Sequence, residues 1–221
     1  MGLLVAIEGA DGVGKNTTAN ALRDTLIAGG RSAELIAFPR YGETVAGVTI
    51  GRFLSGELPV PMTVEAAAVL YALDRLEWRD TLKRALAAND VVVLDRYVAS
   101  NMAYQGAKVP TAQARPLMDW IRALEIDQFA LPLPALNIYL DTPWELAREM
   151  ILKKAQRSYT DRSYDVHEED VALQQRVRAN YEAIAEAGLL GSWRIVQASE
   201  DGTMRATADI VADIMAAIDA L

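Results

Sequence analysis

The sequence predicts an α/β protein in which a five-stranded parallel sheet carries helices on both faces. Three observations lead to this class: short apolar segments alternate with helical patterns, a glycine-rich loop joins the first apolar segment to a helix, and each segment ends beside polar residues. The expected strands, rich in strand-favouring residues, are 3–7, 33–38, 91–94, 136–140 and 194–198. In such folds ligands bind beyond the carboxyl ends of the strands, so we expect the functional site at that edge.

The loop after the first strand, from Gly9 to Lys15, has the spacing of a phosphate-binding loop. It reads GADGVGK and matches the pattern G-x-x-x-x-G-K. Its glycines let several backbone N–H groups converge on a polyphosphate, and the helix expected over 16–28 adds its positive end. We therefore expect a nucleoside triphosphate to contact Gly9, Ala10, Asp11, Gly12, Val13, Gly14, Lys15, Asn16 and Thr17. Asn16 stands where a Ser or Thr hydroxyl usually binds magnesium, so we expect other residues to supply the metal ligands.

Polar residues follow the other strands at the same edge. They are Pro39-Arg40-Tyr41, Asp95-Arg96-Tyr97, Asp141-Thr142 and Ser199-Glu200. A helix is expected from the Thr142 cap to about Lys154, with Glu145 completing a capping box. The segment 153–170 is dense in charge and cannot belong to the core. A helix with an apolar stripe resumes near Val171, and a last helix follows it.

Composition narrows the class of function. The 221-residue chain carries a formal net charge of −8, which opposes binding to nucleic acid. It contains no cysteine, which excludes disulfides, thiolate metal sites and cysteine nucleophiles. No apolar run is long enough to cross a bilayer, so we expect a cytoplasmic protein without membrane contact. We expect one domain over residues 1–221.

A second anchor of the site is the run from Asp95 to Gln105, which reads DRYVASNMAYQ. Its aspartate suits magnesium-bound water, and the planar fork of its arginine suits a phosphate. The run resembles the signature of thymidylate kinases, Asp-Arg-aromatic-x-x-Ser-Asn/Pro-x-Ala-Tyr, at every position. Further landmarks of that family stand in order over nearly the full length, and they are Glu8-Gly9-x-Asp11-Gly12, Phe38-Pro39-Arg40-Tyr41 and Tyr71-x-x-Asp74-Arg75.

The resemblance implies a P-loop fold of the nucleoside-monophosphate-kinase type: three layers, a five-stranded parallel sheet flanked by helices, and a mobile lid over about residues 153–170. It also implies transfer of the γ-phosphoryl group of ATP to dTMP, giving dTDP and ADP in dTTP biosynthesis, by a homodimer with Mg²⁺ as cofactor. No dedicated general base is required, because a monophosphate with a second pKa of about 6 is already mostly dianionic at neutral pH.

The expected dTMP site combines aromatic and cationic side chains. Tyr71, Arg75 and Trp78 share one helical face, so an aromatic plate for a base can lie one turn from an arginine that reaches a carbonyl, which by resemblance is thymine O4. The resemblance also implies that Asn101 meets the base edge and that Tyr104 blocks a ribose 2′-hydroxyl. Ordinary packing and capping remain open for these positions. The full expected set is Asp11, Phe38, Arg40, Tyr41, Tyr71, Arg75, Arg96, Asn101, Tyr104, Gln105, Asp165 and His167.

Phosphoryl transfer needs positive charge on the migrating group. The expected catalytic residues are Lys15, Asp95, Arg96, Arg157 and Arg162, and the expected metal ligands are Asp11, Asp95 and Glu168. This loop lacks the arginine that some thymidylate kinases carry there, so its extra cations are expected from the lid, where Lys153 and Lys154 are further candidates. A merely solvated charged face remains open for the lid. His167 departs from the family, in which a tyrosine is familiar at that position, and it too is open to a solvated role.

Two other functions remain open. A regulatory ATPase would bind the triphosphate to switch partner contacts and would have no nucleotide acceptor pocket. A deoxynucleoside kinase would need a carboxylate to deprotonate a hydroxyl, and Glu8 is the candidate for that role. The run from Asp95 to Gln105, which matches the signature at every position, disfavours a regulatory ATPase. The Asp11-Gly12 loop disfavours a deoxynucleoside kinase.

Overall fold

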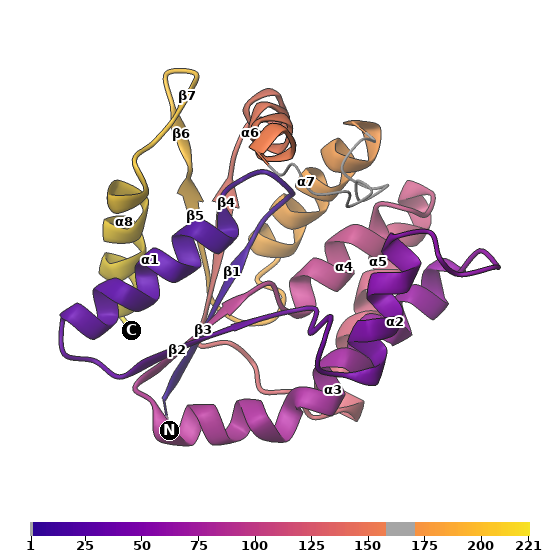
Figure 1. Ribbon diagram of the computed structural model, residues 1–221, viewed down its shortest axis with the longest axis horizontal. Coiled ribbons are helices and arrows are strands. Elements are labelled where there is room, and N and C mark those ends of the chain that lie inside the picture. Colours follow the sequence, from indigo (N-terminus) through magenta and orange to yellow (C-terminus); the bar gives the residue numbers. More distant parts are fainter. Residues whose placement is uncertain (1, 158–170) are drawn as a thin grey trace.

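A computed structural model of the chain describes the backbone of residues 2–157 and 171–221. It also describes the side chains of these residues, except those of residues 153–157. Its centre is a sheet with the strand order β2-β3-β1-β4-β5, in which every pairing is parallel (Figure 1). The strands are β1 (Leu3–Glu8), β2 (Ala33–Ala37), β3 (Val91–Asp95), β4 (Leu136–Asp141) and β5 (Trp193–Gln197). The predicted five-stranded parallel sheet is confirmed, and each strand begins and ends within one residue of its expected bounds.

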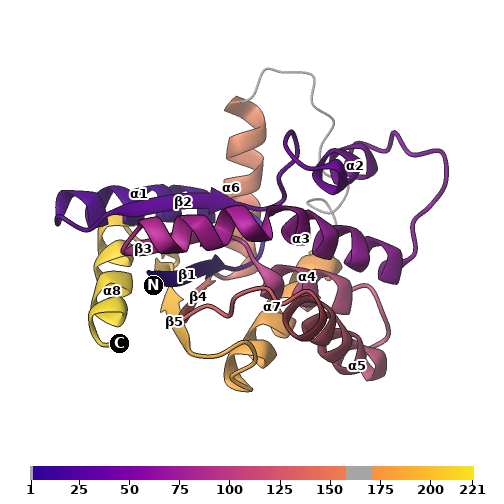
Figure 2. The ribbon, with the colours of Figure 1, turned by 90° about the horizontal axis from the view of Figure 1, so that it is seen from below.

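Helices cover both faces of the sheet (Figure 2). On one face α1 (Lys15–Ala28) packs against α8 (Thr207–Asp219), and on the other α3 (Val64–Ala88) contacts β3 while α7 (Val171–Glu186) contacts β4 and β5. The other helical elements of the described residues are α2 (Val45–Leu54), α4 (Val98–Gly106), α5 (Thr111–Arg122), the π-helical turn η1 (Ala123–Gln128) and α6 (Trp144–Arg157). A short hairpin of β6 (Ser199–Glu200) and β7 (Thr203–Met204) follows β5.

The core forms where the apolar stripes of the helices meet the sheet. All residues of β3 and β4 are buried, as expected of strands covered on both faces. On α1 the buried side chains include Ala19, Leu22 and Leu26, which share one helical face and are all fully inaccessible. On α7 the apolar stripe is also buried, and it consists of Leu173, Val177, Tyr181 and Ile184.

The register of the central strand brings the predicted polar residues to one edge. Ile7 of β1 pairs with Asp95 of β3, and Glu8 pairs with Tyr139 of β4. The loop that follows β1 therefore lies between the carboxyl ends of β3 and β4. That edge is where ligands bind in open parallel sheets.

Truncation of Leu22 tests how α1 is held on the sheet. We expect Leu22→Ala to lower the free energy of unfolding by about 2–5 kcal/mol, because it leaves a cavity in a close-packed interface. Ile27→Ala on the same helix is the matched control, since Ile27 is 52% exposed, and it should cost less than about 1 kcal/mol. Urea unfolding measures both values. Equal losses for the two variants would contradict the packing of α1 against the sheet.

Candidate active site

The phosphate loop connects β1 to α1, and its backbone needs glycine. Gly12 and Gly14 have φ angles of +80° and +87°, in the left-handed region that glycine favours. A Cβ atom at Gly12 would lie 2.2 Å from the carbonyl oxygen of Ala147 on α6, so no side chain fits there. A Cβ at Gly14 would meet no atom within 4 Å, which leaves open space at the amino end of α1. The loop therefore offers an open concave backbone at a helix N-terminus, the geometry that suits a phosphate group.

Lys15 is a buried cation at the start of α1. Its Nζ donates a hydrogen bond to the carbonyl oxygen of Ala10 at 2.6 Å. Burial lowers the pKa of Lys15 to about 8 and the nearby charge of Arg96 adds to the effect, although Asp11 and other carboxylates oppose it. The side chain is folded back on the loop and holds its positive charge next to the space expected for phosphates.

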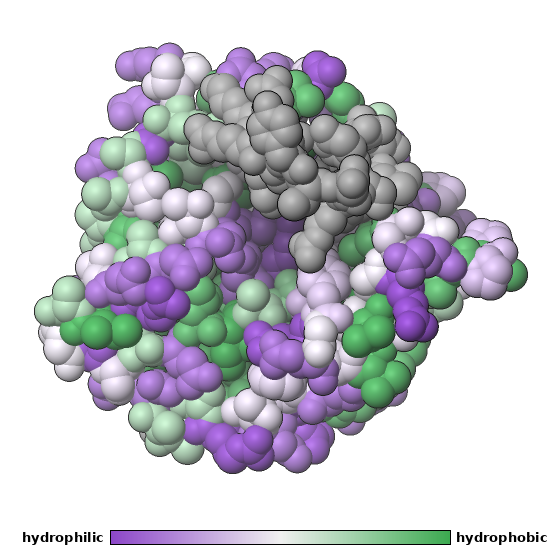
Figure 3. Space-filling view, in the orientation of Figure 1, coloured by the Kyte–Doolittle hydropathy of each residue, from purple (hydrophilic) through white to green (hydrophobic). Residues whose placement is uncertain are grey.

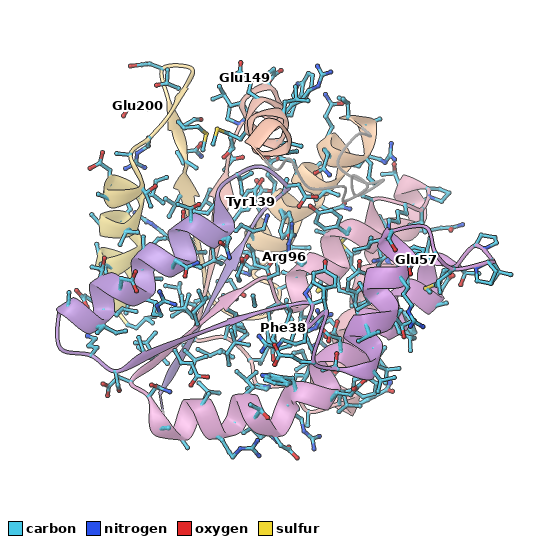
Figure 4. All side chains as sticks on the ribbon, in the orientation of Figure 1. Phe38, Glu57, Arg96, Tyr139, Glu149 and Glu200 are labelled. Atoms are coloured by element: carbon cyan, nitrogen blue, oxygen red, sulfur yellow. The ribbon has the colours of Figure 1, made fainter. Side chains whose placement is uncertain are left out.

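Arg96 lies at the centre of the molecule, with Phe38 below it in Figure 4, whereas Glu149 on α6 and Glu200 on the β6-β7 hairpin lie far out. Its φ angle is +69°, and its N–H donates to the carbonyl oxygen of Ile7 at 3.0 Å. A non-glycine residue in the left-handed region costs free energy and is typical of functional positions. The β1-β3 register therefore holds Arg96 in a strained conformation that directs its side chain to the loop.

The guanidinium of Arg96 is surrounded by groups from the phosphate loop and from α4. It forms an ion pair with Asp11 of the loop, and its Nη1 donates to Ser100 Oγ at 3.3 Å. Its Cζ lies 5.2 Å from the ring centroid of Tyr104. Burial alone would raise the pKa of Asp11, but the charges of Arg96 and Lys15 outweigh it and lower that pKa to about 2. Asp11 is consequently ionised throughout the range in which proteins work.

Glu8 is a fully buried carboxylate beneath this ion pair. It accepts hydrogen bonds from the Tyr97 N–H at 2.8 Å, from Ser100 Oγ at 2.6 Å and from Tyr181 Oη at 3.0 Å. Burial raises the pKa of Glu8, although these hydrogen bonds and the charge of Arg96 lower it in part. The carboxylate is thus already engaged by three donors, an arrangement that supports a structural role over that of a general base for a hydroxyl. Sequence reasoning did not single out Tyr181 for the site, because only the packing of α7 brings it here.

A cleft of about 410 Å³ opens beside these charges. Figure 3, in the orientation of Figure 1, shows hydrophilic side chains gathered in the recessed centre of the visible face of the molecule. The wall of the cleft is built by the loop, the start of α1, the ends of β2, β3 and α2, and one side each of α3 and α4. The lining residues are Asp11, Asn16, Ala37, Phe38, Pro39, Tyr41, Leu54, Tyr71, Arg75, Asp95, Arg96, Ser100, Asn101, Tyr104, Gln105 and Lys108. Elements separated by long stretches of sequence therefore share one cavity.

Most residues expected at dTMP line this cleft, and they are Asp11, Phe38, Tyr41, Tyr71, Arg75, Arg96, Asn101, Tyr104 and Gln105. Arg40 does not line it, because its guanidinium lies 4.3 Å from the ring centroid of Trp78 and pairs with Glu43. Ser100 and Lys108 are added to the wall by the structure; both fall within or next to the signature run, which is the signal that could have found them. The remaining expected lid residues lie outside the described part of the chain, and they are Arg162, Asp165, His167 and Glu168. The side chains of Lys153, Lys154 and Arg157 are likewise outside it.

A buried ion pair supports another part of the cleft wall. Arg75 of α3 binds Glu125 of η1 through two hydrogen bonds, Nε to Oε2 at 2.5 Å and Nη2 to Oε1 at 2.7 Å. Burial alone would lower the pKa of Arg75, but the charge of Glu125 outweighs it and raises that pKa. On α4, Asn101 Oδ1 and Gln105 Oε1 are buried acceptors without a hydrogen-bond partner among the described residues. Unpaired buried acceptors in a cleft wall call for donors from a ligand.

The carboxylates suited to a metal lie on the same wall. Asp95 and Asp11 both line the cleft, but among the described residues no three His, Asp or Glu side chains cluster around one point. Asn16 Nδ2 donates to Asp95 Oδ2 at 3.1 Å. Gln174 of α7 donates through Nε2 to Asp11 Oδ2 at 3.1 Å. Asn16 therefore holds an expected metal ligand in place, where the usual Ser or Thr would offer a hydroxyl instead.

Taken together, this fold and site define a P-loop kinase of the nucleoside-monophosphate-kinase type. The sequence profile of the thymidylate kinase family matches residues 7–210. The chain is 40% identical over 207 residues to the thymidylate kinase of Mycobacterium tuberculosis, which covers 93% of this chain and 96% of that protein. It is 35% identical over 205 residues to the thymidylate kinase of Synechococcus sp., with 90% and 89% covered.

The chain belongs to the thymidylate kinase family, whose reaction it shares: transfer of the γ-phosphoryl group from ATP to dTMP, giving ADP and dTDP. A solved structure of thymidylate kinase from Candida albicans matches the fold with a TM-score of 0.74 at 23% identity, over 99% of this chain and 92% of that one. None of the helices within residues 2–157 and 171–221 is both long and apolar enough to cross a bilayer.

The pKa of Lys15 predicts how nucleotide affinity depends on pH. Lys15 is protonated below its pKa of about 8 and loses its charge as the pH rises through that value. A bound polyphosphate favours the protonated form, so ADP affinity should fall above about pH 8 and binding near that pH should take up protons. Calorimetric titration with ADP in buffers of different ionisation enthalpy measures both effects. An affinity that stays flat as the pH rises past the pKa of Lys15 would contradict the assignment.

The left-handed backbone of Arg96 makes a prediction about stability. Arg96→Gly should be more stable than Arg96→Ala by about 1 kcal/mol, because only glycine adopts this φ angle without strain. Arg84, exposed on α3, is the matched control, where alanine should be the more stable substitution. Urea unfolding measures the order of each pair, and an alanine variant more stable than glycine at 96 would contradict the strained backbone. Both Arg96 variants should lose kcat/KM by at least about tenfold, and near-normal turnover would remove Arg96 from the site.

Proposed function

We propose that the chain carries out the reaction of its family in the cleft beside the phosphate loop, with dTMP in the cleft and ATP on the loop. The observation that carries this proposal is that one cleft is lined both by side chains suited to a base and by a cation suited to a phosphate. Tyr71 and Asn101 supply aromatic and amide groups for a base, and Arg96 supplies a cation next to the loop. A nucleoside monophosphate carries a base at one end and an anionic phosphate at the other, so it matches both groups of side chains.

In the proposed reaction, a phosphate oxygen of dTMP attacks the γ-phosphorus of ATP, and the bond from that phosphorus to the β–γ bridging oxygen breaks to release ADP. Arg96 holds the acceptor phosphate and Lys15 the donor phosphates, so that both reduce the repulsion between two anions. Arg157 and Arg162 are proposed to add positive charge from the lid over about 153–170. Asp165 and His167 are proposed to approach dTMP from the same segment, and Arg40 to approach its phosphate or 3′-hydroxyl.

Magnesium is proposed to bind through Asp95 and Asp11, with Glu168 as a further ligand. The oxygen donors of the described pair fit this hard cation. The hydrogen bond from Asn16 takes Oδ2 of Asp95 and leaves Oδ1, whereas both oxygens of Asp11 are engaged, by Arg96 and by Gln174. Asp95 is therefore the better candidate of the two. Bound Mg²⁺ would supply positive charge that stabilises the migrating phosphoryl group.

We also propose that the protein is a cytoplasmic homodimer in which residues 1–221 form one domain. Support comes from the family resemblance. Sedimentation analysis of the purified protein checks the homodimer.

A coupled assay of ADP release tests the proposed reaction. We expect ATP turnover that depends on dTMP, with little turnover when dTMP is left out or replaced by thymidine. Turnover without an acceptor would instead support a regulatory ATPase. Turnover on thymidine equal to that on dTMP would support a deoxynucleoside kinase.

Tyr104 provides a test of how dTMP is oriented. We expect Tyr104→Ala to admit ribothymidine monophosphate, because the ring that blocks a 2′-hydroxyl is removed and an apolar pocket alone rejects an added hydroxyl only weakly. Tyr104→Phe keeps the ring and is the matched control, so it should retain the preference for deoxyribose. The ratio of kcat/KM for the two monophosphates is the measurement. An unchanged ratio in Tyr104→Ala would move the steric block to another residue.

A further inference from the structure

Glu125 is a fully buried carboxylate just behind the cleft wall. It lies in η1, the π-helical turn that continues α5, and its exposed fraction is 0%. Such turns are rare and occur frequently at functional sites. A buried carboxylate is stable only when donors satisfy it, and both side chains that bind Glu125, Arg75 and Asn101, line the cleft. Glu125 thus connects two wall residues without lining the cleft itself.

The ion pair determines which nitrogen of Arg75 is left for a ligand. Glu125 accepts hydrogen bonds from Nε at 2.5 Å and from Nη2 at 2.7 Å. These two bonds fix the plane of the guanidinium and leave Nη1 as the nitrogen not bonded to Glu125. Arg75 is thereby presented to the cleft as a donor of fixed orientation.

The same carboxylate determines the orientation of the Asn101 amide. Asn101 Nδ2 donates to Glu125 Oε1 and to the carbonyl oxygen of Ala68, each at 2.9 Å. A flipped amide would place Oδ1 against two oxygens, neither of which has a proton to donate, so the observed orientation is strongly favoured. Oδ1 is buried and has no partner among the described residues. At this point the wall therefore offers only an acceptor.

A donor and an acceptor at fixed places distinguish pyrimidine bases. Thymine and uracil present an N3–H donor next to the O4 acceptor. Cytosine presents the reverse, an unprotonated N3 next to an amino group. An acceptor such as Asn101 Oδ1 matches an N3–H and opposes a lone pair, and a site built for one hydrogen-bonding pattern rejects a base that leaves its groups unpaired.

We propose that Glu125 is a positioning residue for base selection: it fixes Arg75 as a donor and Asn101 as an acceptor, and thereby makes the cleft prefer thymine to cytosine. This inference rests on the proposed function, the binding of dTMP in this cleft. Glu125 acts through its two partners and touches no substrate.

The test is Glu125→Gln, which keeps the shape of the side chain but removes its charge and introduces a donor. The new glutamine amide can donate to Asn101 Oδ1, so only the Ala68 carbonyl still opposes a flipped Asn101 amide and its orientation is no longer fixed by two acceptors. We expect the ratio of kcat/KM for dTMP to that for dCMP to fall by at least about tenfold, mainly through KM, with kcat for dTMP largely retained. The ratio for dTMP to dUMP should stay unchanged, since both bases present the same edge to Arg75 and Asn101.

Two further variants serve as control and as independent test. Asp127→Asn makes the same carboxylate-to-amide change two residues along η1, at a side chain that is 53% exposed and paired with Arg122 at 3.0 Å, and it should leave both ratios unchanged. Asn101→Ala removes the acceptor directly and should lower the dTMP to dCMP ratio by itself. Adding Glu125→Gln to it should lower the dTMP to dCMP ratio only through what Arg75 still contributes, so the two effects should be less than additive.

The outcomes separate this inference from the proposed function. A wild-type protein that turns over no ATP with dTMP overturns both. Normal wild-type turnover combined with an unchanged dTMP to dCMP ratio in Glu125→Gln overturns the inference alone, whatever that variant does to the melting temperature. If Glu125→Gln does not fold, an Asn101→Ala protein that keeps the wild-type ratio overturns it instead.

Discussion

Charge balance at the carboxyl end of β1 is the constraint on which the site depends. Lys15 and Arg96 are placed there among Glu8, Asp11 and Asp95, so that each cation has carboxylates close to it. Charges removed from water in this way are tolerated only when they are paired. Burial lowers the pKa of Lys15 to about 8, and the charges of Arg96 and Lys15 lower that of Asp11 to about 2. Both cations lie beside the phosphate loop, whose open backbone at the start of α1 accommodates a phosphate.

Placing these charges at the end of β1 also requires a strained backbone, in addition to the burial of charge. Gly12 and Gly14 accept left-handed angles readily, but Arg96 does so at φ +69° and with a Cβ atom. The parallel register of β1 and β3 sets the position of Arg96, and its ion pair with Asp11 holds the side chain over the loop. Such preorganisation spares the protein from reorienting the arginine when a phosphate arrives.

The part of the cleft proposed to bind the base, around Arg75 and Asn101, contains fewer charges than the phosphate end. There one buried ion pair, between Arg75 and Glu125, replaces the crowded cluster of charges at the phosphate end. The neutral amide of Asn101 completes it, so the wall recognises a base by the direction of its hydrogen bonds. A base is uncharged, and orientation of dipoles discriminates between bases where net charge cannot.

The sequence by itself determined the strands, the phosphate loop and the family, because apolar periodicity, glycine spacing and the run from Asp95 to Gln105 are local signals. It could not determine that Glu125 pairs with Arg75 fifty positions away, or that Gln174 reaches Asp11. Nor could it determine that Arg40 turns to Trp78. Those contacts join elements far apart in the chain, and their distances depend on how helices pack on the sheet. Tertiary structure alone decides which buried charges become partners, since pairing requires proximity that no local pattern encodes.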